Sequence, residues 1–174
     1  MLKKPIVAAI LCVIVVISST VIFTHMRLDS WCKEIGDVFF VSGGIADQLE
    51  KVCDASVGIS KMAEAYGIDS FEAQELSESL RMTTHLKSPH DLFTVYQMLC
   101  GRINDLAAGL KLKDLSAKDA ANLNSLLDEL SSARSAISND GYNSSVTFFL
   151  RTELGAFSTG FAKLCGVNLP EQFA

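Results

Sequence analysis

Apolar residues recur along this chain with the spacing of one face of an α-helix. Beyond residue 30 they follow one another at alternating steps of four and three, in the series Trp31, Ile35, Val38, Ser42, Ile45, Leu49, Val52, Ser56, Ile59, Ala63 and Tyr66. This heptad pattern is typical of a coiled-coil seam and predicts a helix about 50 Å long. Because glycines at 36, 43, 44 and 58 weaken such a helix, we expect another element to pack closely against it.

Helix start and stop signals divide the next part of the chain. Gly67 is expected to end the first helix, and Asp69 followed by Glu72 predicts a second helix that reaches about residue 87. The run Ser88-Pro89-His90-Asp91 combines an N-cap serine with proline at the first helical position. It predicts a third helix, whose seam consists of Leu92, Tyr96, Leu99, Ile103, Leu106 and Leu110.

A fourth helix is predicted from Ser116 and Asp119, and its end is ambiguous. Asp140-Gly141 is a strong local turn signal. Apolar residues nevertheless keep helical spacing on both sides of it, at Leu123, Leu127, Leu130 and Ile137 before and at Val146, Phe149, Leu154, Phe157, Phe161 and Leu164 after. Either the chain reverses at this point, or one long helix continues through it.

The amino-terminal segment is apolar on every side. The run from Pro5 to Phe23 carries no charge and has about the length that crosses roughly 30 Å of hydrocarbon. A cleaved signal would fit the small residues 18–20, but apolar residues 21–23 continue past them. We therefore expect residues 5–24 to lie in a lipid bilayer, with residues 1–26 forming a cytoplasmic stub and single-pass anchor.

The charged residues on either side of the predicted membrane span indicate its orientation. Lys3 and Lys4 precede the span, whereas Arg27 and Lys33 lie close to acidic residues beyond it. This arrangement favours a cytoplasmic amino terminus in the cell membrane and an extracytoplasmic remainder.

Composition narrows the fold and the partners. The chain of 174 residues has 20 Asp and Glu against 15 Lys and Arg, a net charge of -5, so it lacks the basic surface that nucleic-acid binding requires. Only 3 prolines interrupt it. An all-α fold without a nucleic-acid partner is therefore expected.

Candidate catalytic and metal-binding groups are few. His85, His90 and Asp91 flank a proline corner and do not share a helical face, so no metal site is expected. The cysteines beyond the anchor have no histidine in a local motif, so no thiol nucleophile is expected. The sequence indicates no catalytic residue and no cofactor.

The spacing of the cysteines limits which pairs can form a disulfide. Cys32 and Cys53 lie 21 residues apart on one predicted helix, about 30 Å, which is too far for a disulfide. Pairing of Cys32 with Cys165 and of Cys53 with Cys100 stays open. The preferred interpretation is that all of them are buried free thiols.

Both ends of the part beyond the anchor resemble the LemA family. The tail carries a Tyr-Asn pair followed at the family's distances by apolar and aromatic residues, and Trp31 stands fourteen residues before Ile45, as in the family's first helix. The matching tail positions are Tyr142, Asn143, Val146, Phe149, Gly166, Val167 and Phe173. Of these, Trp31, Ile45, Tyr142, Asn143, Phe149, Gly166 and Phe173 are taken as structural positions.

The chain also departs from the family pattern. Phe39, Phe40 and Val41 replace a Gln-Arg-Arg run, Ala46 and Asp47 replace Pro and Asn, and Phe149-Leu150 and Phe157 replace a second Tyr-Asn and a Pro. The resemblance therefore implies no polar functional site in this chain, because the family's polar residues are replaced. The resemblance implies that Asp140-Gly141 lies inside one helix from residue 116 to about 165. It also implies that residues 27–174 form an antiparallel up-and-down four-helix bundle with long helices.

The function that these patterns favour is that of a bacterial, membrane-anchored scaffold or interaction module without catalytic activity. Its expected partners are the bilayer and unidentified membrane or envelope proteins, and a second copy of the chain could fill the heptad seam. A sensor or signalling bundle that binds a ligand is the alternative. A thiol- or metal-dependent hydrolase is the weakest candidate, because the seams supply mostly apolar side chains.

Overall fold

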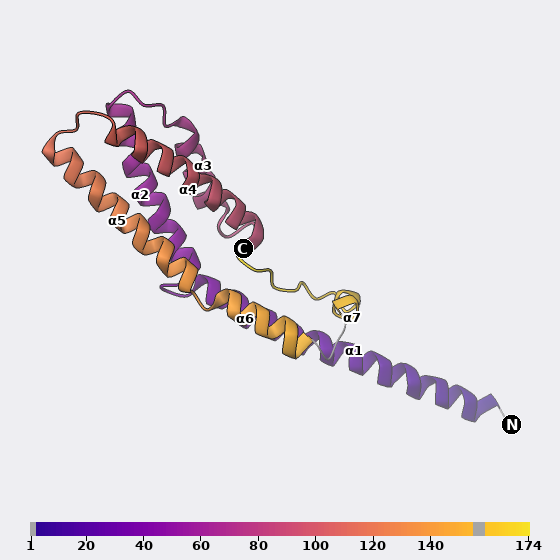
Figure 1. The fold of residues 1–174 in the computed structure, drawn as a ribbon. Helices are drawn as coiled ribbons and strands as arrows, with labels where there is room; N and C mark the ends of the chain where they lie inside the picture. Colours follow the sequence, from indigo (N-terminus) through magenta and orange to yellow (C-terminus); the bar gives the residue numbers. More distant parts are fainter. Residues whose placement is uncertain (1–2, 155–158) are drawn as a thin grey trace. The chain divides into compact units, whose positions relative to one another are not determined.

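Every regular element in the described part of the chain is helical, as expected for an all-α protein (Figure 1). The computed structural model describes residues 3–154 and 159–174, so Phe157 lies outside it. The elements are α1 (Lys3–Phe40), α2 (Ile45–Ala65), α3 (Phe71–Thr83), α4 (Pro89–Lys111), α5 (Ala117–Asn139), α6 (Tyr142–Phe148), the π-helical η1 (Phe149–Glu153) and α7 (Thr159–Leu164).

The first half of α1 is long and apolar enough to cross a membrane, with a mean hydropathy of 3.0 over its most apolar window. Large apolar side chains are exposed all round it, among them Ile6, Val7, Ile10, Leu11, Val13, Ile14, Val15, Val16, Ile17, Ile22 and Phe23. Length and apolarity therefore agree with the predicted anchor. The division at residues 26 and 27 stays a prediction, and α1 continues through it.

The chain forms two compact units. One joins the residues up to Asp37 with Ser145–Pro170, and the other joins Val38–Ser144 with Glu171–Ala174. The core of the first unit packs one face of α1 with η1, α7 and the segment after it. Its buried members are Leu28, Phe149, Leu154, Ala162, Cys165 and Val167.

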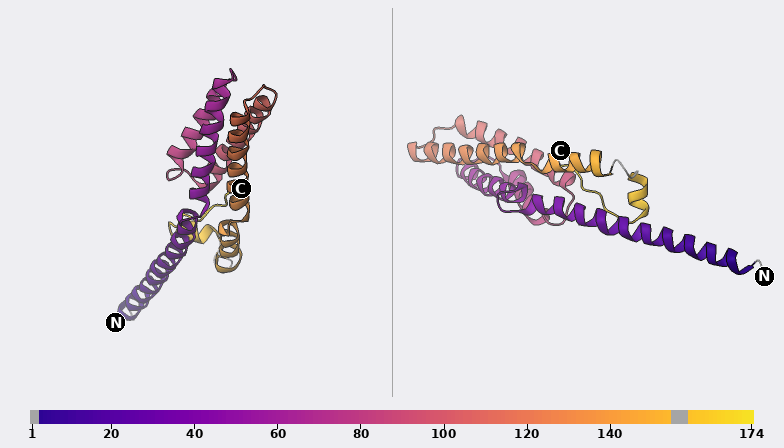
Figure 2. Two further views of the ribbon diagram at one scale, coloured as in Figure 1. Left: turned by 90° about the vertical axis from the view of Figure 1, so that its left-hand side faces the viewer. Right: turned by 90° about the horizontal axis from the view of Figure 1, so that it is seen from below.

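In the second unit α2 packs against α3, α4 and α5, and α3 packs against α4 (Figure 2). The predicted seam of α4 is buried at all six positions, from Leu92 to Leu110. Three helix signals are confirmed as well, whereas α3 has Ser70 rather than Asp69 at its N-cap and ends at Thr83, before the expected residue 87. Ser88 and Ser116 accept the backbone N–H groups of Asp91 and Asp119, and Gly67 ends α2 with a φ of 70°.

The predicted first long helix is wrong between residues 41 and 44. Gly43 has a φ of 84°, which glycine adopts readily, and its N–H donates to Asp47 Oδ2 at 2.7 Å. The heptad seam holds from Ile45 to Ala63 but fails at Ser42, which is exposed. Of the four glycines, Gly58 has the closely packed neighbour we expected, since Leu126 lies against it.

The predicted continuous helix from 116 to about 165 is also wrong. Asp140 is extended, with φ −64° and ψ 143°, and its Oδ1 accepts the Tyr142 N–H at 2.7 Å at the start of α6. The side chain of Asp140 thus supplies an acceptor for the first backbone N–H of α6. Neither long helix of the expected bundle is continuous, and the four-helix arrangement itself stays a prediction.

Candidate functional site

The second unit brings three of the sequence-predicted positions together around the carboxyl-terminal residues 171–174. Tyr142 and Asn143 open α6, and Phe173 lies 30 residues further along the chain. We call these groups, with the aromatic rings that surround Phe173, the tail slot. Sequence resemblance had marked Tyr142, Asn143 and Phe173 without showing that they meet.

Asn143 holds the main chain of Phe173 with both ends of its amide. Its Nδ2 donates to the Phe173 carbonyl oxygen at 2.8 Å, and its Oδ1 accepts the Phe173 N–H at 2.8 Å. The Tyr142 hydroxyl donates to the Glu171 carbonyl oxygen at 2.7 Å. The slot therefore binds the main chain of the tail through hydrogen bonds of the kind that a neighbouring strand makes.

The ring of Phe173 fills an aromatic cage and is 2% exposed. Its centroid lies 5.1 Å from that of Phe93, 5.7 Å from Tyr96 and 5.8 Å from Phe39. Phe39 in turn packs edge-on against Tyr142 at 5.2 Å. Burial of this ring and the mutual packing of the aromatic rings are expected to dominate the stability of the tail in its slot.

The tyrosines of the slot stay neutral at physiological pH. Burial and, to a smaller extent, the charge of Glu171 together raise the pKa of Tyr142 to about 12. Burial likewise raises the pKa of Tyr96. Tyr142 is therefore a permanent hydrogen-bond donor to the tail.

The two histidines of the proline corner make different contacts. His90 Nδ1 lies 2.7 Å from the main-chain oxygen of Ala174, so it adds a polar contact to the end of the tail. His85 stacks on Phe40 with centroids 5.1 Å apart. Among the described residues no group of three or more His, Cys, Asp or Glu side chains could hold a metal ion.

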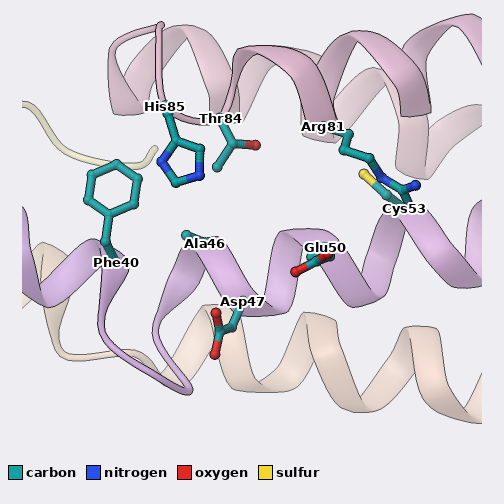
Figure 3. A pocket seen from close by; sticks show the side chains of 8 residues that line it. All are labelled: Phe40, Ala46, Asp47, Glu50, Cys53, Arg81, Thr84 and His85. Carbon is teal, nitrogen blue, oxygen red and sulfur yellow. The ribbon is translucent and has the colours of Figure 1, made fainter.

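A shallow pocket of about 180 Å³ lies between α2 and the end of α3 (Figure 3). It is lined by Phe40, Ala46, Asp47, Glu50, Cys53, Arg81, Thr84 and His85. Several of its polar groups already have partners within the protein. Arg81 pairs with Asp54, Asp47 accepts the Gly43 N–H, and Thr84 donates to the Leu80 carbonyl oxygen.

The cysteines are free thiols in the structure. Burial raises the pKa of Cys53 and Cys100 above the ordinary value, and it also raises that of Cys32. A raised pKa keeps a thiol protonated and weakly nucleophilic. Cys32 packs against the same apolar cluster as Cys165, whereas Cys53 contacts the carbonyl oxygen of Ser77.

The remaining motif positions make packing and turn contacts. Trp31 packs edge-on against Phe149 with centroids 6.3 Å apart, and the Arg27 guanidinium lies 4.5 Å from the Trp31 ring centroid. Ile45 is buried at the start of α2. Gly166 ends α7 with a φ of 75°, while Val167 N–H donates to the Ala162 carbonyl oxygen at 3.1 Å.

Comparison with family models, curated proteins and solved structures gives no match. The resemblance to the LemA family thus stays an expectation. Sequence reasoning missed the contribution of Phe39 and Phe93 to the slot. Their signal was weak, because Phe39 stands next to an equally apolar but exposed Phe40, and Phe93 lies beside the α4 seam.

Proposed function

We propose that this protein is a membrane-anchored helical protein of the LemA type that acts as a scaffold or interaction module and has no catalytic activity. The observation that carries the proposal is the apolar first half of α1, whose side chains are exposed on every face. Such a surface is unfavourable in water and suits a lipid environment. Residues 5–24 would cross the cell membrane, with the amino terminus in the cytoplasm and residues 27–174 outside it.

The tail slot and the thiols support a non-catalytic role. The slot places its polar groups on main-chain atoms of the chain's own tail, and the raised pKa values of Cys53 and Cys100 disfavour thiolate chemistry. A bundle of α2–α5, presented on an anchor, would offer helical faces to membrane or envelope proteins. The pocket beside His85 is the place where the alternative, a ligand-binding sensor, would bind its ligand.

Extraction from membranes tests the anchor. The full chain should stay in the membrane after treatment with alkaline carbonate. Val13→Arg with Val16→Arg should release it, because each arginine costs roughly 2.5–3.5 kcal/mol at the centre of a membrane helix. Met82→Arg with Leu86→Arg is the matched control at exposed apolar sites of the other unit and should leave the chain in the membrane. Release of the unmodified chain would contradict the proposal.

Copurification tests the interaction role. Proteins retained from solubilised membranes by the full chain are compared with those retained when residues 1–26 carry an unrelated helical domain. We expect the full chain to retain specific proteins that the form with the unrelated domain does not retain. Identical sets from both would show that the extramembrane part recruits nothing.

A further inference from the structure

The core of the first unit reaches into the segment that would cross the membrane. Every described side chain of α1 before Val21 is exposed, but Val21 is partly buried against the cluster around Leu28, and Thr24 is 5% exposed. These three positions share one face of the helix, because they follow one another at steps of three and four. The elements that cover this face therefore lie beside the last turn of the proposed span, residues 5–24.

On the opposite face of α1 an apolar surface continues past this level. Ile22, Phe23 and Met26 are exposed there, and lipid would suit them as it suits the span itself. Just beyond them the exposed Arg27 places its guanidinium 4.5 Å from the ring centroid of Trp31. Tryptophan is enriched where hydrocarbon meets the headgroups. The edge of the bilayer would therefore lie where α1 carries the cluster on its other face.

α7 presents an exposed apolar side chain beside that cluster. Leu164 is 82% exposed, although Ala162 and Cys165 on either side of it are buried members of the cluster. Lys163 directly precedes it and is also exposed. A leucine beside a lysine suits the membrane interface, because the leucine enters the acyl chains while the long lysine side chain keeps its charge among the headgroups.

The direction of α7 fits the same location. Within the first unit α7 crosses the line of α1 rather than following it (Figure 1, Figure 2). Membrane helices are tilted by only about 20° on average from the bilayer normal. A helix that crosses the span would therefore lie close to the plane of the bilayer, as interfacial helices do.

We propose that α7 is a second membrane contact of this protein, a short interfacial helix that places Leu164 at the headgroup boundary and Lys163 near the lipid phosphates. The inference rests on the proposed membrane anchor and adds a lipid-binding surface to it. Because the cluster of Leu28, Ala162 and Cys165 joins the two helices, α7 would also fix the depth at which α1 sits in the bilayer.

Depth-dependent quenching of tryptophan fluorescence tests this contact. The full chain carries Trp31→Phe, which removes its single tryptophan, and is reconstituted into vesicles of phosphatidylcholine and phosphatidylglycerol. Bromine atoms on the acyl chains, either near the headgroups or near the bilayer centre, quench tryptophans at their own depth. Leu164→Trp should lose roughly half of its emission or more to the shallow bromine and clearly less to the deep bromine, because about 15 Å of hydrocarbon separates the two levels.

Two exposed positions serve as references. Val13→Trp lies in the middle of the proposed span and should be quenched most by the deep bromine. Leu112→Trp, at an exposed leucine of the other unit, should be quenched by neither, and it shows whether a tryptophan alone draws a site to the bilayer. If circular dichroism shows that Leu164→Trp is unfolded, Lys163→Trp at the preceding exposed position replaces it, with the same expected depth.

Three results would overturn the proposal. If Leu164→Trp is quenched no more than Leu112→Trp while Val13→Trp is quenched, α7 does not touch the bilayer and the anchor still holds. Stronger quenching of Leu164→Trp by the deep bromine would place α7 inside the hydrocarbon rather than at its boundary. Without quenching of Val13→Trp the anchor itself fails, and the membrane contact of α7 fails with it.

Discussion

The two helix breaks in the second unit look alike in sequence, since each contains glycine within an otherwise helical pattern, yet they are built differently. At residues 41–44 the backbone itself requires glycine, because Gly43 has a positive φ and Gly44 leaves no room for a side chain. At residues 140–141 the break depends on a side chain. Asp140 accepts the Tyr142 N–H, whereas Gly141 has no positive φ and no atom close to where a Cβ would stand.

Glycine content alone therefore does not locate a helix end. The first break depends on the positive φ that glycine permits. The second depends on an aspartate side chain that accepts a backbone N–H. Substitution of the four residues should therefore have effects that differ in size and, in one case, in sign. Each is measured as the denaturation midpoint of the full chain in detergent micelles.

The largest effect is expected for Gly44→Ala. The added Cβ would stand 2.7 Å from the Val38 carbonyl oxygen and 3.0 Å from those of Phe39 and Val41. Because all of these atoms belong to the backbone, relief requires the main chain to move, at a cost of about 2–3 kcal/mol. A loss of stability as small as that of an ordinary surface substitution would show that the break is not tightly packed.

Gly43→Ala should cost less, about 1–2 kcal/mol, because the penalty is the left-handed backbone alone and no atom lies within 4 Å of the new Cβ. Gly43→Asn is the control, since asparagine tolerates this conformation better than alanine does. The asparagine variant should be the more stable of the two. The reverse order would contradict a positive φ at this position.

Asp140→Ala should destabilise the protein by about 1 kcal/mol, because the Tyr142 N–H loses its acceptor. Asp140→Asn keeps an oxygen at the same place and should cost less. Equal stability of the alanine variant and the unmodified chain would mean that the side chain does not form the break.

Gly141→Ala should have the smallest effect and the opposite sign, a stabilisation of about 0.5 kcal/mol. Alanine loses less conformational freedom on folding, and the new methyl group meets nothing within 4 Å. A clear loss of stability would place Gly141 in a conformation that only glycine tolerates, and the contrast with Gly43 would disappear.

The periodic parts of the fold could be predicted from the sequence, because a buried stripe on a regular helix is a local pattern. The α4 seam, the serine caps at 88 and 116 and the glycine that ends α2 belong to this class. The breaks at 41–44 and 140–141 could not, because heptad spacing ran through the first and helical spacing stood on both sides of the second, which masked the local signals. In the second case the family resemblance reinforced the error, although Asp140-Gly141 was itself a correct sign of an interruption.

The tail slot could be predicted only in part. Resemblance selected Tyr142, Asn143 and Phe173 as structural positions. That the backbone belongs to residue 173 is a contact across 30 positions, which no local pattern encodes. The cage needed Phe39 and Phe93 from two further elements, and only packing brings them together.

Hydrogen exchange at the Phe173 amide shows whether the tail is held in the tail slot. The N–H that donates to Asn143 Oδ1 should exchange roughly tenfold or more slowly in the full chain than in the Asn143→Ala variant, because loss of the amide acceptor exposes the proton to water. An exchange rate equal to that of an unstructured peptide in the unmodified chain would contradict the tail slot.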